Sequence, residues 1–209
     1  MAEYTDEIEL DSQEFEMPKY PPLMKLREKK LFVKYIKQVK SKKAYLEIGV
    51  FRGGSLSLAI LNAPDNMLAF IGIDPMNPSK LALLSNGMNF TKHPSWVVFA
   101  NIDDCRKRRD IPPVIIYPER SVYVDINSYP MKSLKGKVGF LLIDGAHEYD
   151  AIVLDGKFID LVCKGGIVAF HDYGALHTPH SKEAADAVVV EKNLKFLEHI
   201  ERLAIFKKN

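Results

Sequence analysis

Residues 45–60 read YLEIGVFRGGSLSLAI, and this stretch decides the fold. Its first six residues are apolar or β-branched apart from one glutamate, which is typical of a buried strand, and apolar residues resume with helical spacing after the glycines. Gly49, Gly53 and Gly54 have no Cβ, so the backbone can adopt positive φ there and a ligand can lie directly against it. The unpaired N–H groups of the following helix favour an anionic group, and Ser55 adds a hydroxyl at the helix start. The stretch therefore predicts a strand, a glycine turn and a helix start that together bind a ligand.

A second buried strand is predicted by LAFIGID, residues 68–74, which ends in a carboxylate. Asp74 lies about twenty residues beyond the glycine turn, the separation at which an acidic residue meets ribose hydroxyls in nucleotide-binding units. An ionised carboxylate only accepts hydrogen bonds and therefore suits a diol. The glycine turn and Asp74 together indicate a nucleotide-like ligand.

The composition is that of one compact domain, with 209 residues, 47% hydrophobic and 27% charged. A net charge of +2 is too small to indicate nucleic-acid binding. Cys105 and Cys163 lie too far apart for a zinc knuckle or a disulfide framework, which favours a cytoplasmic protein. No apolar run approaches the ~18 residues of a membrane span, and the acidic N-terminus is unlike a signal peptide. We expect an acidic, disordered tail at residues 1–20 and a single domain at residues 21–209.

The rest of the chain alternates between apolar runs and segments with helical spacing. The third strand is either VIIY, residues 114–117, which we favour, or VYVDI, residues 122–126. VGFLLID, residues 138–144, is a buried strand that ends in a carboxylate. The remaining predicted elements are helices within residues 23–43, 95–109, 151–162 and 181–192, a glycine turn at 164–166, a strand at 167–170, and two antiparallel strands within 194–208.

This alternation predicts an α/β fold, with a Rossmann-like, doubly wound, mostly parallel sheet and an antiparallel hairpin at its C-terminal edge. Ligands of such sheets bind outside the carboxyl ends of the strands. The glycine turn, Asp74, Asp144 and the pair His171-Asp172 each follow a predicted strand. We therefore expect all four to converge on one edge of the sheet.

Four stretches, YLEIGVFRGGS, FIGIDP, LLIDGAHEYD and GGIVAFHDY, resemble class I S-adenosylmethionine-dependent methyltransferases, most closely the family called methyltransferase domain 24. The resemblance implies a seven-stranded sheet with a reversed last strand, and S-adenosyl-L-methionine as cofactor. It also implies that the glycine loop and its serine hold the methionine end, that Asp74 binds the ribose, and that Glu47 orients the loop. The adenine contact would come from Ser121, or from Asn127 if the third strand is the later run. The implied cofactor residues are Glu47, Gly49, Gly53, Gly54, Ser55, Asp74 and Ser121.

The same resemblance implies a second group, Asp144, His171 and Asp172. Relatives that methylate sugar or catechol hydroxyls hold a divalent metal with carboxylates at positions matching Asp144 and Asp172, and with a third ligand at or next to the position of His171. Many of them have two acidic groups where this chain has a histidine and an aspartate, and an imidazole shifts the preference from Mg²⁺ toward Mn²⁺. His147 or His171 is then the candidate general base. The alternative is that Asp144 only caps a turn and that His171 is a buried, hydrogen-bonded histidine.

The leading functional hypothesis is O-methylation of a small hydroxylated acceptor, by a protein with no clear signal for nucleic-acid binding and no membrane span; a homo-oligomer is one of the oligomeric states left open. One alternative is a nicotinamide-dependent oxidoreductase, although three residues separate Gly49 from Gly53 where a dinucleotide turn has the spacing GxGxxG. Another is a non-catalytic scaffold that uses the acidic tail and the basic helix near the N-terminus as interaction surfaces.

Overall fold

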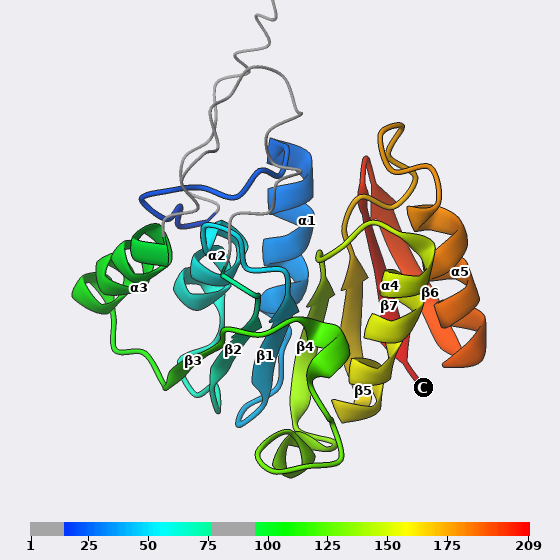
Figure 1. Cartoon of the computed structure of the whole chain (residues 1–209). Helices are drawn as coiled ribbons and strands as arrows, with labels where there is room; N and C mark the ends of the chain where they lie inside the picture. Colours follow the sequence, from blue (N-terminus) through cyan, green and yellow to red (C-terminus); the bar gives the residue numbers. More distant parts are fainter. Residues whose placement is uncertain (1–14, 77–94) are drawn as a thin grey trace, which may run out of the picture.

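The computed structural model describes residues 15–76 and 95–209, which form a seven-stranded sheet with helices on both faces (Figure 1). The strand order is β3-β2-β1-β4-β5-β7-β6. Strands β1 to β5 are parallel, whereas β7 runs antiparallel to both β5 and β6. This confirms the predicted Rossmann-like sheet with its antiparallel C-terminal hairpin. The strands are β1 (Ala44–Ile48), β2 (Phe70–Ile73), β3 (Val114–Tyr117), β4 (Val138–Ile143), β5 (Val162–Phe170), β6 (Leu194–Ile200) and β7 (Leu203–Lys208).

Helices α1 to α3 cover one face of the sheet, and α4 and α5 cover the other (Figure 1). Tyr45 and Leu46 are neighbours in β1, point to opposite faces and are both fully buried, as expected for a central parallel strand. On the first face, the ring of Phe140 packs 5.2 Å from that of Phe32 of α1 and 5.7 Å from that of Tyr45, measured between centroids. The helices are α1 (Leu26–Ile36), α2 (Gly54–Asn62), α3 (Ser95–Arg108), α4 (Tyr149–Asp155) and α5 (Ser181–Glu191), with short 3₁₀ helices η2 (Ser121–Tyr123), η3 (Met131–Leu134) and η4 (Gly156–Leu161).

The structure decides between the two candidates for the third strand and corrects two other predicted elements. The favoured run, residues 114–117, is β3, while the alternative run at residues 122–126 starts inside η2, where the Tyr123 side chain is exposed. The helix predicted at residues 151–162 divides into α4 and η4, and the turn predicted at 164–166 lies inside β5. Gly165 adopts a φ of +77° there, so the glycine pair bends a strand rather than ending a helix.

The segment before α1 lies across the helices of the first face, and we call residues 15–24 the N-terminal strap. The side-chain amide of Asn62 accepts from the backbone N–H of Glu16 at 2.9 Å and donates to its carbonyl at 2.8 Å. Asn101 of α3 does the same for Tyr20, at 2.9 and 3.0 Å. Each asparagine therefore satisfies both the N–H and the carbonyl of one strap residue, and these bonds fix the strap to α2 and α3.

The predicted tail, residues 1–20, therefore extends too far, because its last six residues belong to the folded domain. Residues 1–14 lie outside the described part of the chain, as do residues 77–94 of the long connection after β2. None of the described helices is both long and apolar enough to cross a membrane.

Candidate active site

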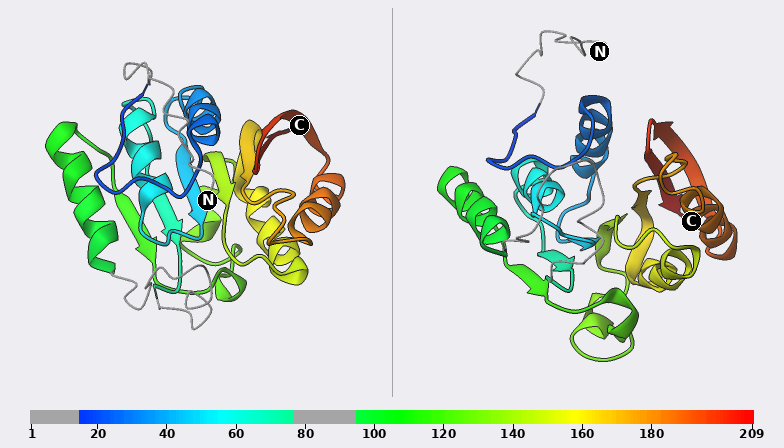
Figure 2. Two further views of the ribbon diagram at one scale, coloured as in Figure 1. Left: turned by 90° about the horizontal axis from the view of Figure 1, so that it is seen from above. Right: turned by 45° about the horizontal axis from the view of Figure 1, so that its top comes forward.

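The glycine loop, residues 49–53, joins β1 to α2 at the edge where the parallel strands end; Figure 2 (left) views the molecule from above this edge. Gly49 has a φ of +88°, and Gly53, the N-cap of α2, a φ of +73°. A Cβ on Gly49 would lie 2.6 Å from the carbonyl carbon of Asp144 and closer still to its oxygen. The loop therefore needs glycine at this position, because its backbone presses on the end of β4.

Asp74 holds this loop in place. Its Oδ2 accepts the backbone N–H groups of Val50 and Phe51, both at 2.9 Å, and its Oδ1 accepts that of Met76 at 2.7 Å. A carboxylate offers about four lone-pair sites, so one remains for a ligand hydroxyl. The structure thus shows a loop-anchoring role for Asp74, and its predicted contact with ribose stays a prediction.

Glu47 ties β1 to the first turn of α2 from beneath the loop. It is fully buried, accepts from the hydroxyl of Tyr45 at 2.8 Å and accepts from the hydroxyl of Ser55. Burial raises the pKa of Glu47 to about 8, against the lowering effect of these two donors. The Ser55 hydroxyl therefore points toward Glu47, which leaves only its lone pairs for a cofactor.

Two further predicted cofactor residues lie against protein groups. A Cβ on Gly54 would come within 2.5 Å of the backbone nitrogen of Pro22, so the N-terminal strap occupies the space in front of this glycine. Ser121 of η2 lies near the side chain of Asp155, a buried carboxyl whose pKa burial raises to about 6 against the lowering effect of the Ser121 hydroxyl. Asn127, the alternative adenine contact, is exposed. Gly54 is thus explained by packing, and the adenine contact stays a prediction.

The predicted second group does come together, at the ends of β4 and β5, and we call Asp144, His171 and Asp172 the acid-histidine cluster. One ligand atom from each lies within 4.8 Å of the others. His171 Nδ1 lies 2.9 Å from Asp144 Oδ1 and 3.8 Å from Asp172 Oδ1. Asp172 adopts a φ of +53°, unusual for a residue with a side chain and a conformation found at functional sites. His147 and His177 approach its carboxylate from outside, at 3.3 and 3.7 Å.

Two residues that sequence reasoning missed complete this edge. Glu28 of α1 is fully buried, with Oε2 3.8 Å from His171 Nε2. Arg202, in the turn between β6 and β7, donates its backbone N–H to Glu28 Oε1 at 2.9 Å and places Nη1 3.1 Å from Asp172 Oδ1. A signal for Glu28 was available, since it lies three and four residues before the buried Leu31 and Phe32 and hence on the apolar face of its helix. For Arg202 the sequence offered no signal.

These contacts determine the charge of His171. Burial alone lowers its pKa, but the carboxylates of Asp144 and Glu28 outweigh that effect and raise it to about 10. Burial alone raises the pKa of Glu28, but the nearby His171 ring, 3.8 Å away, and hydrogen bonds from the backbone N–H groups of Lys25 and Arg202 lower it to about 2. The raised pKa favours the charged form of His171 between the two carboxylates. The assignment of the general base to His147 or His171 stays a prediction.

The acid-histidine cluster can accommodate a divalent cation on one condition. Two carboxylates and an imidazole form a mixed oxygen and nitrogen donor set of the kind that Mn²⁺ accepts. A cation would take the Nδ1 atom of His171 that now faces Asp144, so the ring must first lose its proton. The residues therefore fit a divalent metal ion, which would compete with a proton for the Nδ1 atom of His171.

A profile described as "Methyltransferase domain" matches residues 46–173, a range that contains both the glycine loop and the acid-histidine cluster. The chain belongs to this methyltransferase family. Its fold and family are those of class I S-adenosylmethionine-dependent methyltransferases.

The chain is also similar to a curated relative and, in fold, to solved structures. The uncharacterized protein R132 of Acanthamoeba polyphaga mimivirus is 31% identical over 132 residues, which cover 62% of this chain and 51% of that protein. This chain thus spans about half the length of that relative. The apo structure of CalS11, a TDP-rhamnose 3'-O-methyltransferase of calicheamicin biosynthesis, shares the fold with a TM-score of 0.57 and 16% identity, covering 87% of this chain and 77% of its own. The N-methyltransferase NodS from Bradyrhizobium japonicum WM9, in complex with S-adenosyl-L-homocysteine, has a TM-score of 0.56 and 10% identity, with coverages of 87% and 86%.

Proposed function

We propose that this methyltransferase transfers the methyl group of S-adenosyl-L-methionine to a hydroxyl of a small acceptor, assisted by a divalent cation at the acid-histidine cluster. The observation that carries the proposal is the contact between the two halves of the site. Gly49 of the glycine loop packs directly on the backbone of Asp144, the first member of the acid-histidine cluster. The cofactor loop and the candidate acceptor site are therefore adjacent, as group transfer between them requires.

For the cofactor, we assign the methionine end to the backbone of the glycine loop and the start of α2. The N–H groups at this helix start favour the carboxylate of the methionine moiety. The remaining lone pair of Asp74 would accept from a ribose hydroxyl, and Ser121 would lie on the adenine side. Glu47 acts from below, because it fixes the first turn of α2 through Ser55.

For the acceptor, we assign Asp144, His171 and Asp172 as the residues that hold the cation. When bound, a divalent cation lowers the pKa of the acceptor hydroxyl and holds its oxygen at this edge. His147 is the candidate base, since Nδ1 lies 3.3 Å from Asp172 Oδ2 and its side chain is 45% exposed. In the transfer the acceptor oxygen forms a bond to the methyl carbon while the carbon–sulfur bond breaks, and His147 takes the hydroxyl proton. The products are the methyl ether and S-adenosylhomocysteine.

The test is Asp144→Asn, with Asp150→Asn on the exposed first turn of α4 as the matched control. We expect Asp144→Asn to bind S-adenosylhomocysteine within about twofold of the parent, a difference of roughly 0.4 kcal/mol, but to lose Mn²⁺ binding measured by calorimetry. Turnover of hydroxylated acceptors should fall in this variant and in EDTA, and should persist in the control. Undiminished turnover of the parent protein in EDTA would refute the role of the metal. Unchanged Mn²⁺ binding by Asp144→Asn would refute the assignment of Asp144 as a metal ligand.

A further inference from the structure

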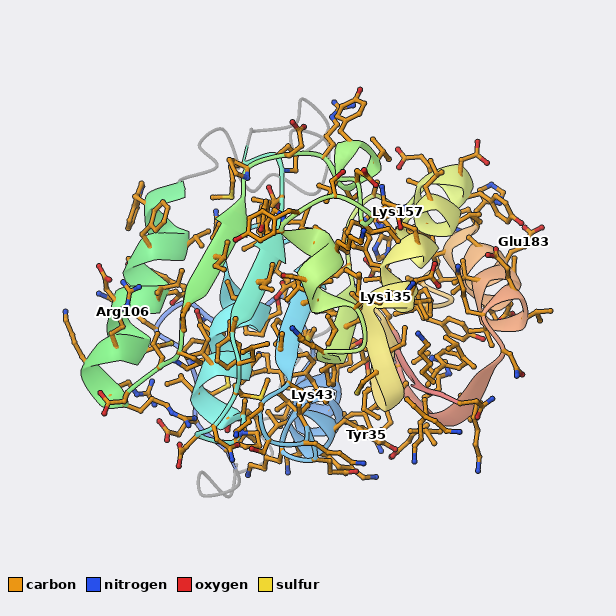
Figure 3. All side chains as sticks on the ribbon, turned by 90° about the horizontal axis from the view of Figure 1, so that it is seen from below. Tyr35, Lys43, Arg106, Lys135, Lys157 and Glu183 are labelled. Atoms are coloured by element: carbon orange, nitrogen blue, oxygen red, sulfur yellow. The ribbon has the colours of Figure 1, made fainter. Side chains whose placement is uncertain are left out.

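A cavity of about 370 Å³ lies at the edge of the sheet opposite the glycine loop, where β4 and β5 begin. Four lysines line it, Lys40, Lys43, Lys164 and Lys207, and we call it the lysine pocket. Figure 3 views the molecule from that side and labels Lys43 together with Tyr35 of α1, another lining residue. We propose that the lysine pocket binds a small anionic molecule that carries phosphate or carboxylate groups and an apolar part.

Charge is the first argument. No aspartate or glutamate occurs among the described residues that line the pocket, although the chain has 27 acidic residues against 29 basic ones. Lysines elsewhere are paired with acids, for example Lys182 with Asp186 at 2.5 Å and Lys192 with Asp160 at 3.1 Å. Glu198, which accepts from the lining residue Tyr35 at 3.1 Å, is itself paired with Lys34. In the pocket, Lys43 Nζ donates to the uncharged carbonyl of Gly136 at 2.9 Å. Like charges gathered around a concave surface attract an anion from several sides at once.

The backbone provides the second argument, because the pocket is built from an irregularity in the sheet. The β4–β5 register passes from Val138↔Val162 to Phe140↔Ile167, so one residue of β4 faces four of β5, residues 163–166. Lys164 and Gly165 lie within this bulge. Strand bulges are designed features that often redirect side chains at binding sites.

The segment after α1 forms the facing wall. A Cβ on Gly139 of β4 would lie 2.6 Å from Val39 Cγ1 and 2.7 Å from the Cβ of Lys43. Glycine at this position therefore lets Val39 and Lys43 rest directly on the strand. The two walls place lysines on both sides of the cavity, with Lys40 and Lys43 on one and Lys164 on the other.

The ligand class follows from size and lining. The volume lies in the range of small-molecule sites, about 300–1,000 Å³. Val39, Ile167 and Leu197 give the pocket apolar surface beside the lysines. A single-stranded nucleic acid needs an extended basic groove, whereas this cavity is one compact hollow. Because the lysine pocket and the glycine loop lie at opposite edges of the sheet, its ligand is neither the cofactor nor the acceptor.

The experiment is calorimetric titration of the full chain with phenyl phosphate and with benzoate, in saturating S-adenosylhomocysteine so that the cofactor site is filled. We expect saturable binding of one or both anions, which distinguishes phosphate from carboxylate, and no binding of phenol. The double variant Lys164→Gln/Lys207→Gln should weaken binding about tenfold or more, since two of the four charges are lost. Lys107→Gln/Lys132→Gln, which removes two exposed lysines elsewhere, is the matched control.

The charge-preserving double variant Lys164→Arg/Lys207→Arg should keep the affinity, which separates loss of charge from loss of fold. Absence of saturable binding by the parent protein would overturn the proposal. Equal weakening in the two glutamine double variants would do so as well, because it would reduce the effect to the overall charge. Tighter binding of a short single-stranded RNA than of phenyl phosphate, with the same dependence on Lys164 and Lys207, would assign the surface to nucleic acid instead.

Discussion

Replacing Gly49 by alanine tests whether the glycine loop and the end of β4 form one rigid unit. The new Cβ would meet backbone atoms only, lying 2.6 Å from the carbonyl carbon of Asp144 and 2.8 Å from Gly145 Cα. Ordinary contacts of a Cβ begin at 3.4 Å and the carbonyl oxygen of Asp144 would be the closest atom, so the end of the strand must move by more than an ångström. No flexible side chain is available to absorb that shift.

The expected loss of stability in Gly49→Ala has two parts, and a control variant separates them. Gly136 also has a positive φ, +69° against +88° for Gly49, but a Cβ there would meet nothing within 4 Å. Gly136→Ala should therefore lose only the conformational preference of glycine, about 1–2 kcal/mol. Gly49→Ala should lose this and add an overpacking cost of about 1–3 kcal/mol, for a total of roughly 2–5 kcal/mol.

The assay is urea unfolding followed by circular dichroism, with parent, Gly49→Ala and Gly136→Ala measured side by side. We also expect Gly49→Ala to weaken S-adenosylhomocysteine binding, because Asp144 and the loop move together, while Gly136→Ala leaves it unchanged. If the two variants lose equal stability, the contact between Gly49 and Asp144 does not exist as described and the adjacency on which the proposed function rests is lost.

Three other variants probe the interior of the site. Glu28→Gln leaves His171 and Arg202 without their buried counter-charge and should lower the free energy of unfolding in urea by about 3 kcal/mol. Glu198→Gln, in a half-exposed pair, should lower it by less than about 1 kcal/mol. Equal losses of stability in the two variants would contradict the role of Glu28. The pKa of Glu47 is raised to about 8, so its contribution is complete below pH 4.5 and is lost as the pH rises through 8, at up to about 1.4 kcal/mol per pH unit. Glu47→Gln should therefore flatten the fall in unfolding free energy between those pH values, and an unchanged slope would show that Glu47 ionises normally. Asn101→Ala removes both bonds to Tyr20 and should cost about 2 kcal/mol and open the N-terminal strap to proteolysis, which is read from the cleavage rate; a strap as resistant as in the parent would refute its anchoring by Asn101.

The sequence was sufficient for the centre of the sheet because the parallel strands β1, β2 and β4 are buried on both faces and therefore appear as continuous apolar runs. It was sufficient for the acid-histidine cluster because Asp144 and His171 directly follow such runs, and the ends of parallel strands meet at one edge. The turn predicted at residues 164–166 was wrong because glycine is common both where a helix ends and where a strand bends. Arg202 was missed because its importance comes from a contact between distant segments, which no local pattern records, whereas the helical pattern of α1 did place Glu28 on a buried face.

The bond between Glu28 and Arg202 joins residues 174 positions apart and has a consequence for how the protein is made. During synthesis, α1 therefore emerges well before the turn that carries Arg202. Until then Glu28 lacks two of its donors and Asp172 lacks its guanidinium, so a nascent chain with all the parallel strands in place still has an incomplete acid-histidine cluster. Completion of this cluster therefore depends on formation of the β6–β7 hairpin.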